Sequence, residues 1–513
     1  MPEDNKSLSQ SALKNSAYSF LGYVFPIVFS IVVTPIMVLK LGKVDFGVYV
    51  FINTLIILLG LLDLGLSSAF IKYLSHYRYL GHTDRIKDLV HSNNSLFFLI
   101  GLIGFLVLIA AGWLAKSLLP FVNFPADYFL EIFGLAGLMF FINTAATVFM
   151  IAPRALERYD VSTKIDLALL IVSNLLTLVL LLSGLRLLGI LAGQTVIAFI
   201  FAFVYYLNCR KILPQAGLKF AWVREEIINC YRFGLKTFVA SLAGSSLNYL
   251  DRLLIPFYLG PAALTYYSLP GNVTNHIPGV SNSLTAVLFP MISGLNSLND
   301  REKIKKIYIQ SIRLVTIIVF AITASIMLFA YKIMLYWLGL DFAVNSTNVM
   351  IVLTLTHFLI ALSKPLTSIL LGLDKTRFLA LSSLAMASLN IALIFILLPW
   401  GIYGIAWAFL LSVLPIIYMF YYVEKKFLGL AGRLKAYLLL YGKNLIVSII
   451  FFPLIHYLFL PLTINVYILI VAGPAAVLLY LLLYKILGFI ELDDWCVLQN
   501  FYRPIVRQLL NKQ

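Results

Sequence analysis

Residues 233–260 read FGLKTFVASLAGSSLNYLDRLLIPFYLG, a mostly apolar run long enough to cross a lipid bilayer as one helix. The run ends in Leu259-Gly260, and the same dipeptide stands 218 positions earlier as Leu41-Gly42. Nearly the same spacing separates Lys14 from Arg232, Tyr49 from Tyr267, Leu156-Glu157-Arg158 from Leu373-Asp374-Lys375, Tyr205-Tyr206 from Tyr421-Tyr422, and Arg210-Lys211 from Lys425-Lys426. The sequence therefore predicts two hydrophobic halves of equal size, an arrangement found in many transporters.

The composition is that of a membrane protein. Hydrophobic residues make up 61% of the 513 residues, charged residues 12%, and the mean hydropathy is +0.96, whereas soluble domains carry about 25% charged residues. The apolar runs are continuous rather than alternating, which predicts helices. We expect an all-α, polytopic membrane protein with about fourteen spans: 16–39, 47–71, 95–119, 128–152, 165–183, 187–208, 233–259, 265–293, 312–338, 346–371, 378–398, 402–423, 436–459 and 463–484.

The matched segments give the boundaries of the predicted domains. A six-helix lobe at 13–212, a cytoplasmic linker at 213–230 and a second six-helix lobe at 231–427 come first. Two additional helices at 436–484 and a cytoplasmic tail at 485–513 follow. Because each lobe holds an even number of spans, the two repeats are predicted to be parallel, related by an axis along the membrane normal.

Basic residues are distributed unevenly between the two sets of loops. If the N-terminus and alternate loops share one side of the membrane, that side holds 30 of the 38 Lys and Arg residues, and the opposite loops hold five. The positive-inside rule then predicts a multi-pass protein of the cytoplasmic (inner) membrane with both termini in the cytoplasm. The net charge of +16 is thus explained by topology and by attraction to anionic lipid, and nucleic acid is not an expected partner.

Catalytic and metal-binding motifs are not found in the sequence. It contains no Walker A sequence, no GxSxG, no HExxH, and no Asp/Glu cluster with metal-ligand spacing. The three cysteines, Cys209, Cys230 and Cys496, form no CxxC pair. We therefore expect no cofactor and no enzymatic activity, and we expect an ion gradient, a substrate gradient or a partner to supply the energy.

Charges inside the predicted spans are candidates for a site, because charge is costly in hydrocarbon. Four polar residues of the seventh span are spaced four, three and four apart, which places them on one helical stripe: Ser241, Ser245, Asn248 and Arg252. The same span holds Lys236 and Asp251. Lys236 is close enough to the end of the span to extend to the surface instead, and Asp251 with Arg252 could belong to the outer mouth of the helix.

Further candidates lie in the eighth and tenth spans. His357 and Lys364 are seven residues apart and so nearly superimposed on one helix face, and Asn275 lies in the eighth span. Arg offers a planar donor fork and Lys a compact charge, so these groups favour a phosphate or pyrophosphate ligand. The predicted substrate-binding residues are Lys236, Asn248, Arg252, Asn275, His357 and Lys364. A hydrogen-bonded packing role remains the alternative for His357.

Three other charges are assigned coupling or structural roles. Asp63 lies two to three turns inside the second span, where it could carry a coupling proton, pair with Lys72 or order the helix end. Arg154 ends the fourth span. Asp251 is the third of these residues. The first half is otherwise poor in cations within its spans, so positive charge for a ligand is expected mainly from the second half.

An ordered set of segments resembles the Wzx-type polysaccharide flippases, the polysaccharide transport family within the multidrug/oligosaccharidyl-lipid/polysaccharide (MOP) exporter superfamily. These segments are LGKVDFGVYV (41–50), LLDLGLSSAFIKYLS (61–75), ALERYD (155–160), NYLDRLLIPFYLGPAALTYYSLP (248–270), FPMIS (289–293) and LLGLDKTR (370–377). The resemblance extends over residues 10–430. The last two spans resemble those of fourteen-span members such as the peptidoglycan lipid II flippase.

The resemblance implies a V-shaped, MATE-like bundle that translocates a polyprenyl-pyrophosphate-linked oligosaccharide by alternating access, as the lobes rock, for cell-surface polysaccharide biosynthesis. It implies H+ or Na+ as a coupling ion, membrane lipid around the tail of the substrate, and glycosyltransferases and a polymerase of the same pathway as partners.

Three other functions stay open at the level of the sequence, and one of them is a scaffolding role without transport. An ion-coupled multidrug or small-molecule antiporter of the same superfamily would favour buried carboxylates and aromatic rings for organic cations, whereas Lys and Arg dominate here. A membrane glycosyltransferase or polymerase acting on lipid-linked sugars would need catalytic residues in a sizeable outer loop, and the predicted outer loops are short.

Overall fold

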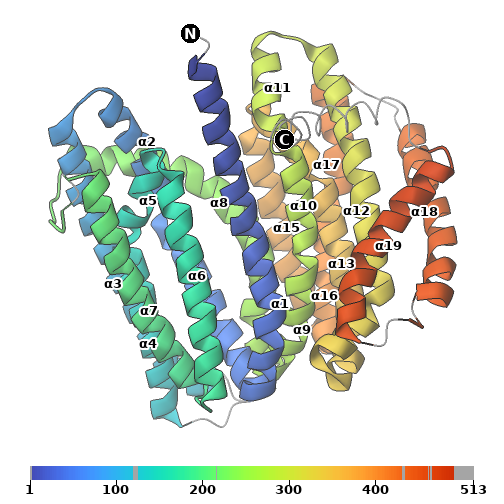
Figure 1. The fold of residues 1–513 in the computed structure, drawn as a ribbon, viewed down its shortest axis with the longest axis horizontal. Coiled ribbons are helices and arrows are strands. Elements are labelled where there is room, and N and C mark those ends of the chain that lie inside the picture. The colour runs from blue at the N-terminus through green and yellow to red at the C-terminus, as the bar shows by residue number, and fades with distance from the viewer. Residues whose placement is uncertain are drawn as a thin grey trace. The chain divides into compact units, whose positions relative to one another are not determined.

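The computed structural model describes residues 3–118, 125–214, 217–429, 434–459, 461–462 and 465–489, and every regular element in these ranges is a helix (Figure 1). The prediction of an all-α protein is confirmed. The contacts between residues divide the chain into two compact units, unit 1 (Met1–Thr265) and unit 2 (Tyr266–Gln513). The lobe boundaries drawn from the repeat, 13–212 and 231–427, stay a prediction.

The helices of unit 1 are α1 (Glu3–Leu59), η1 (Gly60–Asp63), α2 (Leu66–Tyr79), α3 (Thr83–Leu118), α4 (Ala126–Ala145), α5 (Thr147–Ala155), α6 (Tyr159–Leu182), α7 (Leu187–Ile212) and α8 (Arg224–Tyr258). Helix α9 (Pro261–Thr274) begins in unit 1 and continues into unit 2. The helices of unit 2 are α10 (His276–Thr285), α11 (Leu288–Ser297), α12 (Arg301–Leu338), α13 (Leu340–Leu362), α14 (Lys364–Gly372), α15 (Thr376–Leu397), η2 (Leu398–Trp400), α16 (Gly401–Val413), α17 (Pro415–Val423), η3 (Glu424–Leu428), α18 (Leu434–Leu454), η4 (Ile455–Phe459) and α19 (Val466–Ile486).

Ten segments of the described residues are long and apolar enough to cross a membrane, judged by length and composition. The count of fourteen spans therefore stays a prediction. Several of the predicted spans are not single helices. The span 47–71 is divided among α1, η1 and α2, 128–152 between α4 and α5, 265–293 among α9, α10 and α11, 346–371 between α13 and α14, and 402–423 between α16 and α17. The break between α13 and α14 has a local cause, because Pro365 cannot donate a backbone hydrogen bond.

The repeat seen in the sequence is also present in the backbone. Four pairs of residues with left-handed φ angles are separated by 217 or 218 positions: Gly42 (80°) and Gly260 (86°), Gly81 (70°) and Asn299 (54°), Glu157 (61°) and Asp374 (57°), Gly184 (79°) and Gly401 (63°). Left-handed backbone is uncommon outside glycine and marks a specific turn. The two halves of the chain therefore turn at matching positions, as two copies of one architecture would.

Helix α8 packs within unit 1, against α1, α2 and α3. At Gly234 of α8, an added Cβ would lie 2.7 Å from the Leu64 carbonyl oxygen, and at Gly47 of α1 it would lie 1.9 Å from the Pro261 carbonyl oxygen. The rings of Phe51 and Phe257 meet edge to face at 5.4 Å. Glycine at these two positions allows α8 to approach the turn before α2 closely, and allows the start of α9 to approach α1.

The linker predicted for 213–230 is held against α3 over part of its length. Asn94 Nδ2 donates to Gly217 O at 3.0 Å, and Ser95 Oγ donates to Ala221 O at 2.9 Å. Helix α8 already begins at Arg224, so the last part of this segment is helical. The described part of the linker is thus an ordered connection fixed by side-chain hydrogen bonds.

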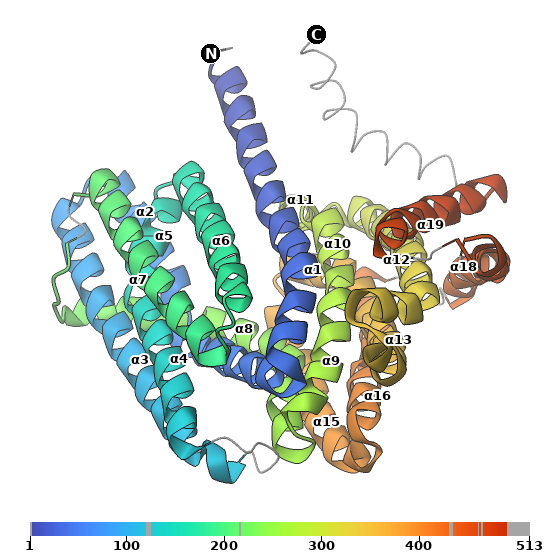
Figure 2. The same ribbon diagram turned by 60° about the horizontal axis from the view of Figure 1, so that its bottom comes forward.

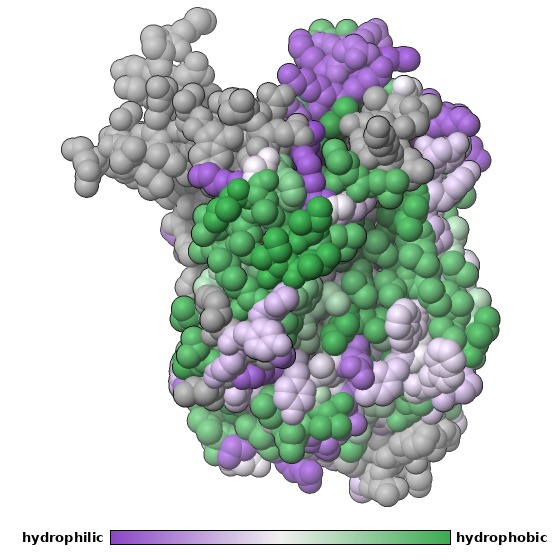
Figure 3. Space-filling view, turned by 90° about the vertical axis from the view of Figure 1, so that its right-hand side faces the viewer, coloured by the Kyte–Doolittle hydropathy of each residue, from purple (hydrophilic) through white to green (hydrophobic). Residues whose placement is uncertain are grey.

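In unit 2, α18 and α19 lie beside α12 (Figures 1 and 2). Their shared core contains Phe329, Phe451, Tyr480 and Tyr484. Outward-facing side chains on the two helices are large and apolar, including Leu438, Leu439, Ile449, Val471 and Leu478. Figure 3 shows hydrophobic residues gathered over the middle of this face and hydrophilic ones above them. This pattern is typical of a surface that faces lipid.

Candidate functional site

The stripe predicted for the seventh span lies on α8. Asp251 is buried, Arg252 is half-buried, and the Arg252 N–H donates to Asp251 Oδ1 at 2.8 Å. The side chains of Lys236 and Asn248 lie outside the described residues. Asp251 and Arg252 are therefore the predicted residues of α8 whose environment is known, and both belong to unit 1.

Lys364 lies at the break between α13 and α14, where it is half-buried. Because Pro365 has no N–H, the Ala361 carbonyl four residues earlier loses its helical donor. Ser281 Oγ of α10 donates to this carbonyl at 2.7 Å. The break is thus built into the packing of α10 on α13, and Lys364 follows it directly.

His357 and Asn275 occupy different environments in the same unit. His357 is buried, its Nδ1 lies 2.9 Å from Leu353 O, and its ring meets Phe409 of α16 edge to face at 6.0 Å. These contacts are those of a packed, hydrogen-bonded side chain. Asn275 is exposed at the junction of α9 and α10.

The structure places the predicted substrate-binding residues in two groups. Asn275, His357 and Lys364 belong to unit 2, whereas α8, with Arg252, belongs to unit 1. A receptor that combines Arg252 and Lys364 stays a prediction.

Arg154 takes part in an ion pair within unit 1. Its Nη2 lies 2.8 Å from Asp166 Oδ2 of α6, and the other oxygen of Asp166 accepts a hydrogen bond from the Tyr205 hydroxyl of α7. Both charged side chains are partly exposed. The arrangement joins the ends of α5, α6 and α7.

Asp63 is the last residue of η1, and the chain then passes through left-handed Leu64 and Gly65 into α2. Its Oδ1 accepts the Ser67 N–H at 3.0 Å. The carboxylate therefore satisfies a free N–H group in the first turn of α2. This contact orders the start of α2, and a coupling role for Asp63 stays a prediction.

Two buried glutamates were not identified from the sequence. Glu226 at the start of α8 is fully buried, and it accepts from Tyr77 at 3.0 Å and from Arg85 at 3.0 Å. Burial, with the Glu226 charge nearby, raises the pKa of Tyr77. In unit 2, the buried Glu424 accepts from Tyr308 at 2.8 Å and from Tyr437. Both glutamates lie between the predicted spans, so no sequence signal marked them, and the structure places them in α8 and η3.

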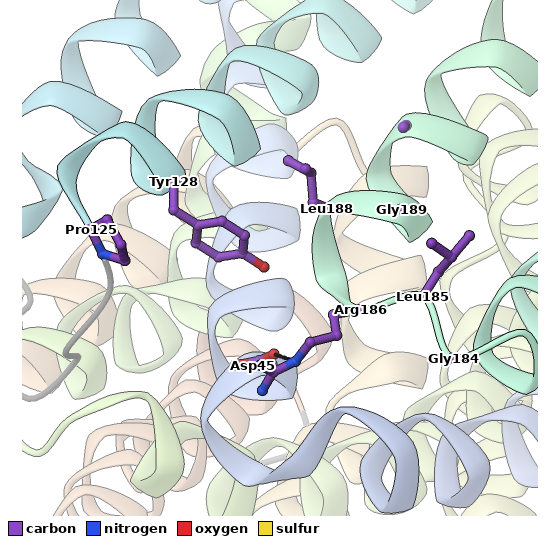
Figure 4. A pocket seen from close by; sticks show the side chains of 9 residues that line it. Asp45, Pro125, Tyr128, Gly184, Leu185, Arg186, Leu188 and Gly189 are labelled. Atoms are coloured by element: carbon purple, nitrogen blue, oxygen red, sulfur yellow. Dashed lines mark ion pairs between the residues drawn. The ribbon is translucent and has the colours of Figure 1, made fainter.

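Unit 1 also contains a pocket of about 550 Å³, which is lined by residues of α1, α4 and α7 and of the segments just before α4 and α7. Figure 4 shows Tyr128 on one side and Arg186 on the other, with an ion pair joining Arg186 to Asp45. The Arg186 Nε lies 3.5 Å from Asp45 Oδ2; the Asp45 side chain is 5% exposed and that of Arg186 is 73% exposed. The pocket offers a ring face, an acceptor and a donor fork to a ligand.

Neither charge of this pocket was assigned to a site from the sequence. The signal that could have found them is the repeat: Asp45 follows Gly42 and Arg186 follows Gly184, two of the turns that recur in the second half. Charges beside recurring turns at the same end of a lobe are expected to lie close together.

The comparison with known families decides the class of the protein. The family described as "Polysaccharide biosynthesis protein" matches residues 12–296, more than half of the chain. This chain belongs to that family. One protein of similar sequence is the "Putative O-antigen transporter" of Shigella flexneri. It is 23% identical over 406 residues, which cover 77% of this chain and 93% of that protein.

Solved structures show the fold of this family member. The lipid II flippase MurJ in an inward closed conformation aligns with a TM-score of 0.69 at 13% identity, covering 96% of this chain and all of MurJ. An inward-facing multidrug resistance MATE family transporter of the MOP superfamily aligns at 0.62 and 14% identity, covering 79% and 94%. The predicted MATE-like helical fold is confirmed.

Proposed function

We propose that this protein is a flippase that moves a polyprenyl-pyrophosphate-linked oligosaccharide across the cytoplasmic membrane by alternating access, for the synthesis of cell-surface polysaccharide. The family supports the place in polysaccharide biosynthesis. The relative named as an O-antigen transporter and the fold shared with a lipid II flippase support transport of a lipid-linked sugar.

The environment of Lys364 is the main support for the proposal. It is half-buried inside a membrane-spanning segment, and it forms no ion pair with any residue that the structure describes. A cation in that position needs a cavity or an anionic partner. The pyrophosphate of the substrate supplies such a partner, with Arg252, Lys236 and the amides of Asn248 and Asn275 as further ligands.

Energy and partners follow from the same proposal. H+ or Na+ is the coupling ion, and Asp63, Asp251 and Arg154 are the charges through which coupling would act. Glycosyltransferases deliver the substrate on the cytoplasmic side, where both termini lie by the positive-inside rule, and a polymerase receives it outside. The reaction requires no cofactor and no bond is made or broken by this chain.

A cellular assay tests the proposal. In a strain from which the chromosomal copy is deleted, lipid-linked oligosaccharide should accumulate on the inner leaflet and surface glycan should disappear. Arg252→Ala and Lys364→Ala should fail to restore surface glycan although their membrane abundance is normal. Arg252→Lys should restore it in part, because the charge remains and the donor fork is lost.

Lys87→Ala is the matched control, since Lys87 pairs with Asp84 at an exposed position. This variant should restore surface glycan fully. Normal surface glycan in the deletion strain, combined with raised sensitivity to cationic dyes, would identify a multidrug antiporter instead. Full activity of both Ala variants would show that neither Arg252 nor Lys364 is needed to bind the substrate.

A further inference from the structure

The two repeats carry different charges at the turn that follows the broken helix. In unit 1 this turn leads from α5 into α6, and Arg158 Nε lies 3.0 Å from Asp160 Oδ1. At a spacing of 217, the matching residues in unit 2 are Lys375 and Arg377. Gly184 and Gly401 keep the same spacing further along, so the alignment holds across this segment.

A second acid is missing from unit 2 in the same region. Asp166, which holds Arg154 and the Tyr205 hydroxyl in unit 1, corresponds to Ser383. The basic pair at the end of the last repeat helix is kept, as Arg210-Lys211 in unit 1 and Lys425-Lys426 in unit 2. Unit 2 has thus kept a base at the position of Arg158 and the basic pair, has Leu371 and Leu381 in place of Arg154 and Lys164, and has lost both carboxylates.

Aromatic rings, rather than carboxylates, contact these cations in unit 2. The ammonium groups lie over rings at 5.6 Å for Lys375 and Phe427, 5.6 Å for Lys425 and Tyr421, and 5.1 Å for Lys426 and Tyr422. The Lys426 Nζ also donates to the Tyr422 hydroxyl at 2.7 Å. Cation–π contacts of this kind position a lysine without neutralising it.

The rings connect the cations into one surface, which we name the basic–aromatic cluster. Its members are Lys375, Arg377, Phe378, Tyr421, Tyr422, Lys425, Lys426 and Phe427. Phe378 stacks on Tyr422 at 4.9 Å, and Phe427 lies 6.0 Å from Tyr422. All four cations of the cluster are exposed, and among the described residues none of them forms an ion pair.

An exposed apolar strip continues from the cluster along the same helices. Leu381 and Leu384 of α15, Leu414 just before α17, and Ile417 and Tyr418 of α17 are exposed. Helices α15 and α17 are in contact and belong to a segment apolar enough to cross a membrane. The cluster therefore lies where this surface passes from hydrocarbon to water, the level at which aromatic side chains anchor membrane proteins.

We infer that the basic–aromatic cluster of unit 2 is a binding site for the headgroup of an anionic phospholipid. Four unneutralised cations attract the phosphate and its negative surface potential, and Lys presents a compact charge to a phosphate oxygen. The acyl chains lie along the strip on α15 and α17. This inference rests on the charges of unit 2 and not on the proposed transport activity.

Native mass spectrometry of the purified full chain tests the site. The probes are dioleoyl-phosphatidylglycerol and dioleoyl-phosphatidylcholine, which share their acyl chains and differ in headgroup charge. The wild-type chain should retain the anionic lipid in preference, and Lys425→Glu/Lys426→Glu should weaken its retention roughly tenfold or more. Arg210→Glu/Lys211→Glu changes the matching pair in unit 1 by the same net charge and should keep the preference.

A second pair of variants protects the test against misfolding. Lys375→Gln/Arg377→Gln should reduce the preference as well, whereas Lys425→Arg/Lys426→Arg should keep it. Equal losses in the unit 1 and unit 2 charge-reversal variants would show a general effect of net charge and overturn the site. Displacement of the lipid by inorganic pyrophosphate at equal concentration would show a site for a free phosphate anion, and would overturn the assignment to a phospholipid.

Discussion

In unit 1, the turn after α5 carries Arg158 beside Asp160, while the matching turn in unit 2 carries Lys375 and Arg377. The backbones of the two turns are alike, since Glu157 and Asp374 share a left-handed φ angle. Charge chemistry has therefore diverged on a retained backbone. Matching positions of the two repeats are therefore most informative about function where their side chains differ in charge.

A second matched position shows the same contrast inside the membrane. Helices α4 and α13 end at equivalent points, and the next helix begins with Thr147 in unit 1 and with Lys364 in unit 2. Thr147 Oγ1 donates to Asn143 O at 3.2 Å, a local helix contact. The break is thus common to both repeats, and a cation follows it in only one.

Exchanging these two residues should have the largest effect. Lys364→Thr should lower the export of lipid-linked sugar by roughly tenfold to a hundredfold, the range expected when a charged hydrogen-bonding group is lost. Adding Thr147→Lys should not restore export, because the new cation stands in the other repeat. Surface glycan, normalised to membrane abundance, is the measurement. Recovery in the double variant would mean that the position of the cation is unimportant and that the contrast between repeats is not functional.

The buried glutamates extend the comparison to stability. Glu226 depends on the cation Arg85, so Arg85→Gln should lower the free energy of unfolding, because it leaves a buried carboxylate without its cation. Lys87→Gln, two residues away, breaks an exposed pair with Asp84 and should lower the free energy of unfolding by about 0–0.5 kcal/mol.

Glu424 depends on hydroxyl donors, so Tyr308→Phe should destabilise unit 2 although no charge is removed.

Unfolding monitored by the melting midpoint in detergent ranks these variants. An Arg85→Gln variant as stable as Lys87→Gln would show that Glu226 does not need its cation.

The smallest expected effect is on the reactivity of the Cys230 thiol near the start of α8. Burial raises the pKa of Cys230 to about 11, although a hydrogen bond from Asn93 lowers it. At pH 8 roughly one thiol in a thousand is then ionised, and the fraction rises as pH increases toward 11. In a chain with Cys209→Ala and Cys496→Ser, Cys230 should therefore resist alkylation, while a cysteine at the exposed Ser297 should react readily.

Alkylation of Cys230 also tests whether the packing of α8 changes during transport. Cys230 should remain protected during transport, since α8 packs on α2 and α3. Rapid alkylation that begins only when substrate is present would place the motion at this contact instead.

Much of the fold could be predicted from the sequence. The continuous apolar runs predict helices, and the spacing of Leu41-Gly42 and Leu259-Gly260 anticipates turns that recur in the backbone. The breaks were harder, because an apolar run of constant hydropathy conceals a kink. Pro365 marks one of them in the sequence, whereas the matching break at Ala146 has no proline.

The candidate site could be predicted less completely. Lys364 stands out because charge is rare within spans, and its half-buried position agrees with that interpretation. Asp45 and Arg186 were hidden, since the two charges lie far apart in the chain, between predicted spans, and only the fold brings them to 3.5 Å. His357 shows the opposite case, because a polar residue that attracts notice in the sequence has ordinary packing contacts.

Reconstituted flipping tests the central claim most directly. The purified chain is placed in liposomes with a labelled polyprenyl-pyrophosphate-linked sugar on both leaflets, and a membrane-impermeant glycosidase is added outside without nucleotide. The account predicts that the enzyme reaches the sugar of the inner leaflet as well as the outer one when the wild-type chain is present and an ion gradient is imposed, and only the outer one with Lys364→Ala. Protection of the inner-leaflet sugar in the presence of folded wild-type chain would contradict it.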